Sequence, residues 1–273
     1  MAGLETRFSD TRVDTAARAR RSRAPGRPAV RRLAVAYVIG LHLAVGGLVV
    51  KTDFLTRLNH LLVESAGTAE FDDGFRRWSS ALARSDAYAR PGALVFLGDS
   101  IMRDLDTSSI ARHTLNMAIP GDTTARLLDR MRSYRSVKTA RGVVFGVGVN
   151  DLYYRSIPEA VANYRRMMRE VPEGTPLMVV APLPVDERVE NAFRNDAIRR
   201  LDEALAALCG ERPGCHFVDP SPRLIDDTGN LAPANHEGDG IHLSNVGHDA
   251  YWSVVNAAVL TDMPPARIVP PAQ

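Results

Sequence analysis

The chain has 273 residues, of which 45% are apolar and 24% charged, a composition that allows one large or two small globular domains with a full core. The net charge of +2 is unevenly divided, because residues 1–32 hold nine arginines against three acidic residues and leave −4 on the remainder. No basic stripe interleaved with aromatic residues follows residue 51, which argues against a nucleic-acid-binding protein.

Two N-terminal segments differ in composition. Residues 1–32 are rich in Arg, Ala and Pro without a sustained apolar period, so we expect a disordered arm. Residues 33–50 are uncharged and, as a helix, nearly span the hydrocarbon core of a bilayer. The arginines before them predict a single-pass transmembrane signal anchor, with the N-terminus in the cytoplasm and residues 51–273 in the periplasm or outside the cell. A cleaved signal peptide and a buried core helix are the alternatives.

Short apolar runs follow a connector over residues 51–90, in which we expect a helix near 70–88. Runs of this length that end at Gly or Pro are typical of strands buried on both faces of a sheet. The order of these runs along the chain predicts five parallel strands. The runs cover residues 93–97, 115–119, 143–147, 176–181 and 216–218.

Helical spacing of apolar residues separates the runs. Ser156 and Glu159 have the spacing of a capping box, which predicts a helix start just after Ser156. Alternating strands and helices argue for one α/β domain over residues 91–262, a parallel sheet with helices on both faces. A Pro-rich tail follows over residues 263–273. The helical patterns cover residues 127–134, 157–171 and 187–209, with a last helix from Ser244.

The chain contains two cysteines, Cys209 and Cys215, which bracket five residues between a predicted helix and a predicted strand. In an exported domain this pair could form a small disulfide, and in a reducing compartment both would be free thiols. Their spacing is not that of a metal site.

A serine follows the first predicted strand in the cluster Gly98-Asp99-Ser100. The hydroxyl is a candidate nucleophile if a base takes its proton, and free N–H groups at a helix start can stabilise an oxyanion. Met102 breaks the Gly-x-Ser-x-Gly pattern, so an α/β-hydrolase elbow is disfavoured. A turn with a capping serine is the plain alternative.

Asp239 and His242 are three residues apart, a spacing that lets the carboxylate reach the near ring nitrogen of His242 and leaves the far one for a serine. A surface aspartate beside a capping histidine is the plain alternative. His236 adds a third group that could ligate a metal, but no fourth ligand is evident, so we expect no metal.

Two further residues follow strand ends. The amide of Asn150 can donate to a developing oxyanion, and Asp151 could brace its loop. Gly121 can present a backbone N–H at close range because it lacks a side chain. Gly146-x-Gly148 as a nucleotide loop is weak, since no third glycine follows. If the strand order reverses beside the first strand, Ser100 and Asn150 face one another across a crevice.

These clusters resemble, in order, the four motif blocks of the SGNH (GDSL-type) hydrolase superfamily over residues 90–260. Residues 119–124 look like its platelet-activating-factor-acetylhydrolase-like branch. Ile101 replaces the usual Leu of the first block. The blocks are Gly98-Asp99-Ser100-Ile101, Gly121, Gly148-x-Asn150-Asp151 and Asp239-x-x-His242.

The resemblance implies a three-layer flavodoxin-like α/β/α fold and a serine esterase that needs no cofactor and no metal. Ser100 would be the nucleophile, His242 the base and Asp239 its orienting carboxylate. The oxyanion hole would be formed by Ser100, Gly121 and Asn150. The expected substrate is a small acyl ester or an acylated carbohydrate, with an O-acetyl group as the first choice. An acyltransferase with the same residues is the second reading, and a non-catalytic envelope scaffold is the third.

Overall fold

The computed structural model describes residues 27–51 and 73–263. The chain divides into two compact units, Met1–Val63 and Glu64–Gln273. Most of the predicted Arg-rich arm, the first part of the connector and nearly all of the Pro-rich tail lie outside the described residues.

The described part of the first unit is one helix, α1 (Arg27–Lys51). It contains the whole of residues 33–50, for which the sequence predicts a transmembrane anchor. Among the described residues, however, no helix combines the length and apolar character needed to cross a membrane. The helical part of the prediction is therefore seen, whereas its transmembrane part is not supported.

The second unit is built on a five-stranded parallel sheet in the order β2-β1-β3-β4-β5, which agrees with the predicted α/β fold and strand number. All neighbouring strands pair in parallel, and Gly98 at the end of β1 lies opposite Gly146 at the end of β3. The strands are β1 (Leu94–Gly98), β2 (Thr114–Asn116), β3 (Gly142–Gly146), β4 (Leu177–Val180) and β5 (Cys215–Val218).

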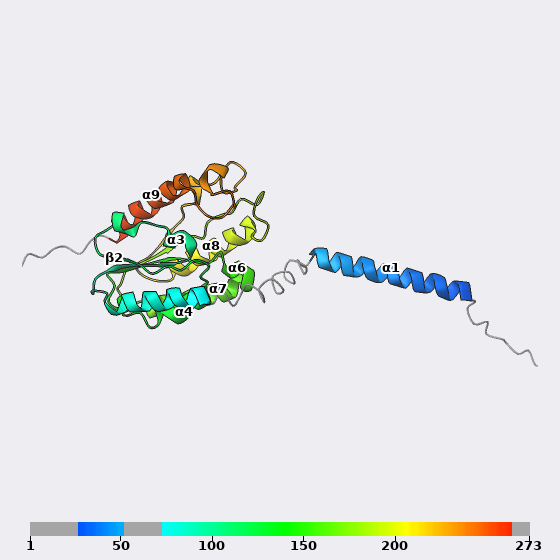
Figure 1. The fold of residues 1–273 in the computed structure, drawn as a ribbon, viewed down its shortest axis with the longest axis horizontal. Helices are drawn as coiled ribbons and strands as arrows, with labels where there is room; N and C mark the ends of the chain where they lie inside the picture. The colour runs from blue at the N-terminus through cyan, green and yellow to red at the C-terminus, as the bar shows by residue number, and fades with distance from the viewer. Residues whose placement is uncertain (1–26, 52–72, 264–273) are drawn as a thin grey trace, which may run out of the picture. The chain divides into compact units, whose positions relative to one another are not determined.

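Helices cover both faces of the sheet and form a three-layer arrangement (Figure 1). One face carries α4, α7 and α8, and the other carries α3 and α9. Residues 73–87 form a further helix, close to the one predicted near 70–88. The helix bounds are α3 (Ser100–Arg103), α4 (Thr124–Met131), α5 (Arg135–Lys138), α6 (Asp151–Tyr154), α7 (Ile157–Glu170), α8 (Asn195–Gly210) and α9 (Asn245–Asp262).

Strand side chains alternate between two apolar cores. Val95 and Leu97 of β1 pack with α4, α7 and α8, whereas Leu94 and Phe96 pack with α3 and α9. A strand buried on both faces has no polar side to alternate with, which is why these segments read as continuous apolar runs. The two cores hold the sheet rigid and fix the positions of the loops at its ends.

The helix starts follow local capping chemistry. Ser156 donates its N–H to Glu159 Oε2 at 2.8 Å, so the predicted capping box begins α7. The predicted helix over residues 187–209 is wrong at its beginning, because α8 starts only at Asn195. The segment before it is a loop in which the Glu187 carboxylate accepts the N–H of Asn195 at 2.6 Å.

Cys209 and Cys215 are bonded to one another, with 5.4 Å between their Cα atoms. The bond joins the end of α8 to the first residue of β5, and no free cysteine is present in the chain. It therefore lies at the amino end of β5, away from the carboxyl ends of the strands.

Candidate active site

The strand order reverses at β1. This strand lies between β2 and β3, so the connection from β2 to β3 passes over it and the strand order reverses there. In open α/β sheets the loops beside such a reversal border the ligand site. Ser100, Gly121 and Asn150 follow β1, β2 and β3 respectively, as the sequence predicts.

Ser100 stands at a tight turn from strand to helix. β1 ends at Gly98 and α3 begins at Ser100, with Asp99 as the cap between them. A Cβ on Gly98 would lie 2.3 Å from the Gly146 carbonyl oxygen and 2.5 Å from Met102 Cβ. Only glycine fits this approach, and as the first residue of α3 Ser100 has no intrahelical partner for its N–H.

Ser100, His242 and Asp239 form a continuous hydrogen-bonded array. Ser100 Oγ lies 3.2 Å from His242 Nε2, and His242 Nδ1 lies 2.6 Å from Asp239 Oδ2. Because the carboxylate can only accept, Nδ1 carries the proton and Nε2 is left as the acceptor for the serine hydroxyl. This geometry can remove the proton from the hydroxyl as the oxygen attacks a carbonyl carbon.

The backbone holds the Asp239 carboxylate in place. Its Oδ1 accepts the N–H groups of Ile241 and His242, each at 2.9 Å. Burial alone would raise the pKa of Asp239, but its hydrogen bonds to His242 and to these two backbone groups outweigh burial and lower the pKa. The carboxylate is therefore ionised and able to stabilise a positive charge on the His242 ring.

Gly121 and Asn150 follow β2 and β3, the two strands that pair with β1. Gly121 has a φ of +72°, a left-handed conformation that favours glycine. Asn150 precedes α6 and donates one amide hydrogen to the Asp122 carbonyl oxygen at 3.0 Å. A side-chain amide has a second hydrogen, which is available for a ligand oxygen. The three predicted oxyanion-hole residues thus come from three adjacent strand ends.

Asp151 braces the Asn150 loop against α4. Its buried carboxylate accepts the Thr124 N–H at 2.8 Å and also bonds the Thr124 hydroxyl and the Arg155 guanidinium. Asn163 of α7 donates to the same Thr124 hydroxyl at 2.9 Å. These contacts fix the position of the backbone next to Asn150.

Asp122, the residue after Gly121, forms a buried ion pair with Arg130 that local sequence patterns do not predict. Arg130 Nε donates to Asp122 Oδ2 at 2.8 Å, and Arg130 also donates to the Met117 carbonyl at 2.7 Å. Burial raises the pKa of Asp122 to about 6, although the Arg130 charge and hydrogen bond act against that increase. The available signal was an arginine beside Leu127 and Met131 on the apolar side of an amphipathic helix.

Asp99 is a second buried carboxyl close to the serine. Its Oδ1 accepts the Ile101 N–H at 3.1 Å. Burial raises the pKa of Asp99 to about 7, and the nearby charges of Asp122 and Asp151 add to the increase. Near neutral pH a large share of this group is therefore the uncharged acid. It also lines a small, mainly apolar cavity with Ile101, Val149, Leu183, Val185, Ile241 and Tyr251.

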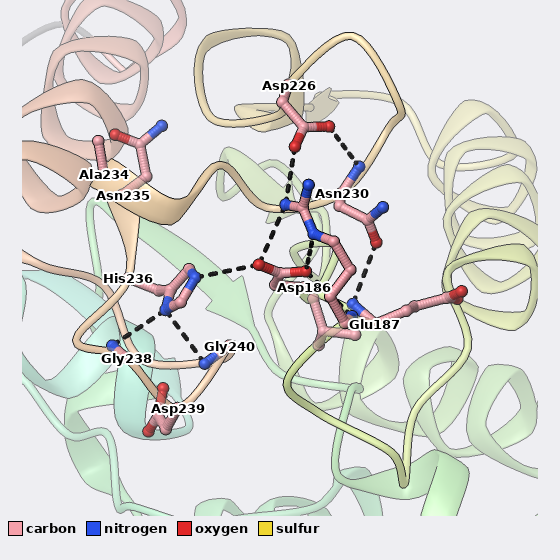
Figure 2. Close-up of polar contacts among 12 residues, drawn as sticks. Asp186, Glu187, Asp226, Asn230, Ala234, Asn235, His236, Gly238, Asp239 and Gly240 are labelled. Carbon is pink, nitrogen blue, oxygen red and sulfur yellow. Dashed lines mark hydrogen bonds and ion pairs between the residues drawn. The ribbon is translucent and has the colours of Figure 1, made fainter.

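His236 lies apart from the serine–histidine–aspartate array. Both its ring nitrogens have partners, Asp186 on one side and backbone N–H groups on the other (Figure 2). Among the described residues no three His, Cys, Asp or Glu side chains gather in the way a metal ion requires.

Comparison with known proteins adds the family. The model of the GDSL-like Lipase/Acylhydrolase family matches residues 66–250, which is more than half of the chain. No curated protein matches the chain.

Several solved structures share the fold. A protein from Streptococcus pneumonia, provisionally described as a platelet activating factor, is 21% identical, with a TM-score of 0.62 over 72% of this chain and 98% of its own. The lipase/acylhydrolase of Enterococcus faecalis is 20% identical, with a TM-score of 0.55 over 64% and 99%. A catalytic mutant of an acetylxylan esterase from Geobacillus stearothermophilus is 17% identical, with a TM-score of 0.51 over 63% and 95%.

Proposed function

Because the chain belongs to the GDSL-like lipase/acylhydrolase family and is a carboxylic ester hydrolase, we propose that Ser100 cleaves a small acyl ester through an acyl-serine intermediate. The observation that carries this proposal is the 3.2 Å contact between Ser100 Oγ and His242 Nε2, with Asp239 on the far side of the ring. An O-acetyl ester is the substrate we propose first.

In the first half of the reaction, Ser100 Oγ attacks the ester carbonyl carbon as its proton passes to His242 Nε2. The carbonyl oxygen becomes an oxyanion, which the N–H groups of Ser100 and Gly121 and the amide of Asn150 stabilise. When the intermediate collapses, the bond to the alcohol oxygen breaks and the alcohol leaves with the proton from His242. Each oxyanion donor is worth about 10²–10³-fold in rate.

In the second half, water takes the place of the alcohol. His242 removes its proton, the water oxygen attacks the acyl carbon, and the bond to Ser100 Oγ breaks as the proton returns to the serine. Asp239 stabilises the positive charge on the His242 ring in both halves. No atom outside the chain, the ester and water is needed for the balance.

The proposed acyl group and the proposed alcohol part of the substrate rest on different observations. A small, mainly apolar cavity is lined by Asp99 and Ile101, the two chain neighbours of Ser100, and we propose that it receives a short acyl chain. One structural neighbour is an acetylxylan esterase, and this makes acetylated carbohydrate a reasonable alcohol partner to test. From residues 119–124 we further propose that the chain belongs to the platelet-activating-factor-acetylhydrolase-like branch of the family.

The substrate proposal is tested with nitrophenyl esters of increasing acyl length and with acetylated xylo-oligosaccharides, on the full chain. We expect the acetyl ester to have the highest kcat/KM and acetate to appear without an added acceptor. A preference for long acyl esters would contradict the small acyl group. Acetate release only when a sugar acceptor is present, with the acyl group recovered on that sugar, would instead indicate the acyltransferase.

We also propose that residues 73–263 function outside the cytoplasmic membrane, held there by residues 33–50. The arginines before this apolar segment favour a cytoplasmic N-terminus, and the Cys209–Cys215 bond favours an oxidising compartment. A C-terminal alkaline phosphatase fusion should be active and sediment with membranes. Activity of a cytoplasmic reporter at the same position would overturn this topology.

A further inference from the structure

Asp239 and His242 are carried by a short loop that has little regular structure of its own. We call residues 236–243 the base loop. An isolated antiparallel bridge between His236 and Leu243 closes it, and the Glu237 N–H donates to the His242 carbonyl at 2.9 Å. Between these ends the backbone turns through Gly238 and Gly240, at φ of +101° and +79°. Something other than a helix or strand must therefore hold the tip of the loop.

The ring of His236 occupies the inside of this loop. Its Nδ1 accepts the N–H groups of Gly238 at 3.0 Å and Gly240 at 3.2 Å. Its Nε2 lies 3.3 Å from Asp186 Oδ2, and the residue is only 8% exposed. A nitrogen that accepts two N–H groups cannot itself carry a hydrogen, so the proton lies on Nε2 and points to the carboxylate. Figure 2 shows these contacts together.

Asp186 is itself fixed as an acceptor. Its carboxylate receives Arg188 Nε at 2.6 Å, and this hydrogen bond is the main reason why the pKa of Asp186 is lowered. Arg188 also bonds Asp226 Oδ2 at 2.8 Å, which ties the pair to a neighbouring loop. The Asp186 N–H donates to the Gly240 carbonyl at 2.8 Å, so Asp186 contacts the base loop twice.

The contacts around Gly240 leave little freedom. A Cβ at this position would lie 3.0 Å from the Asp186 carbonyl oxygen and 3.2 Å from Glu190 Cβ. Gly240 also sits between Asp239 and Ile241, whose N–H bonds the Asp239 carboxylate. Movement of the Gly240 peptide therefore displaces Asp239 and, through it, the ring of His242.

We propose that His236 is a positioning residue for the reaction. The Asp186 carboxylate selects its Nε2–H tautomer, and Nδ1 then accepts the two glycine N–H groups and so holds Asp239 and His242 in line with Ser100. It does not contact the reacting atoms. This inference rests on the proposed function of Ser100, because its kinetic effect is transmitted through that residue's base.

Two substitutions separate the two sides of the ring. In His236→Asn, the amide oxygen replaces Nδ1 as the acceptor for the glycine N–H groups, but the link to Asp186 is lost. In His236→Gln, the longer side chain keeps a donor for Asp186 but loses the acceptor near the backbone. We expect His236→Asn to keep kcat within about threefold, and His236→Gln to lower kcat by about 10–100-fold with little change in KM.

The comparison is made on the full chain with the acetyl nitrophenyl ester, and the rate of Ser100 labelling by a fluorophosphonate is measured in parallel. The labelling rate should fall with kcat in His236→Gln and be retained in His236→Asn. Melting temperatures show whether each variant is folded. Equal losses in the two variants, or a His236→Gln protein with wild-type kcat, would overturn the positioning role.

A measurement without substitution covers the case in which a variant does not fold. Nitrogen NMR of the histidine-labelled wild type should show His236 with Nε2 protonated and Nδ1 unprotonated at neutral pH, and the opposite tautomer or a doubly protonated ring would contradict the proposal. If Ser100→Ala retained hydrolysis, the proposed function would fail on its own, and the tautomer would still decide whether His236 holds the loop.

Discussion

Replacing Ser100 with alanine is expected to abolish ester hydrolysis, with a loss of about 10⁴–10⁶-fold in kcat, because the attacking oxygen is removed and its base has no proton to take. Stability should change little. Ser100 is half-buried, and its hydroxyl forms its hydrogen bond with His242. Hydrolysis of the acetyl nitrophenyl ester and a thermal melt, both on the full chain, measure the two effects.

The matched control is Ser253→Ala, which removes a serine hydroxyl from α9 that bonds only the Ala250 carbonyl among the described residues. That variant should keep wild-type activity. In addition, mass spectrometry of the wild type quenched during turnover should find the acyl group on Ser100. Hydrolysis by Ser100→Ala at the wild-type rate would remove the basis of the proposed mechanism.

Replacing Arg130 with methionine is expected to be the most destabilising single change near the site, by about 3–5 kcal/mol, because it leaves a buried carboxyl without its partner. The side chains of Arg130 and Asp122 are 4% and 0% exposed. The change should also lower kcat, since the Asp122 carbonyl is the acceptor for Asn150. Urea denaturation, followed by a spectroscopic signal from the second unit, gives the free energy of unfolding.

Arg132→Met is the control on the same end of α4, because Arg132 makes a long contact of 3.5 Å to Glu170 and is half-exposed. A surface pair of this kind contributes at most about 1 kcal/mol. Adding Asp122→Asn to Arg130→Met should recover part of the lost stability, since a neutral amide then replaces the buried carboxyl that has lost its partner. Equal stabilities of Arg130→Met and Arg132→Met would show that the buried pair has no special role.

The sheet could be anticipated from sequence because strands buried on both faces stand out as apolar runs between glycines and prolines. The second run shows the limit of this approach. The predicted strand covers residues 115–119, whereas β2 is Thr114–Asn116 and only Met117 and Ile119 continue to bond β1 with their N–H groups. An apolar run indicates burial, but it does not show where regular pairing ends.

The central residues of the site can be predicted from the sequence for a similar reason. Ser100 and Asn150 follow strand ends, and Asp239 and His242 are close enough in sequence to interact within one turn. The supporting contacts are different, because they join residues that are far apart in the chain. His236 and Asp186 are 50 positions apart, and nothing in local spacing indicates that their side chains meet.

The catalytic array joins Ser100 and His242, which are 142 positions apart in the sequence. The serine follows the first strand, and the histidine lies in the last loop before the final helix. Closing so long a stretch of chain costs entropy, which the packing of the intervening strands and helices must offset. An unfolded chain therefore has no base beside Ser100, because the contact with His242 exists only where the fold has brought the two residues together.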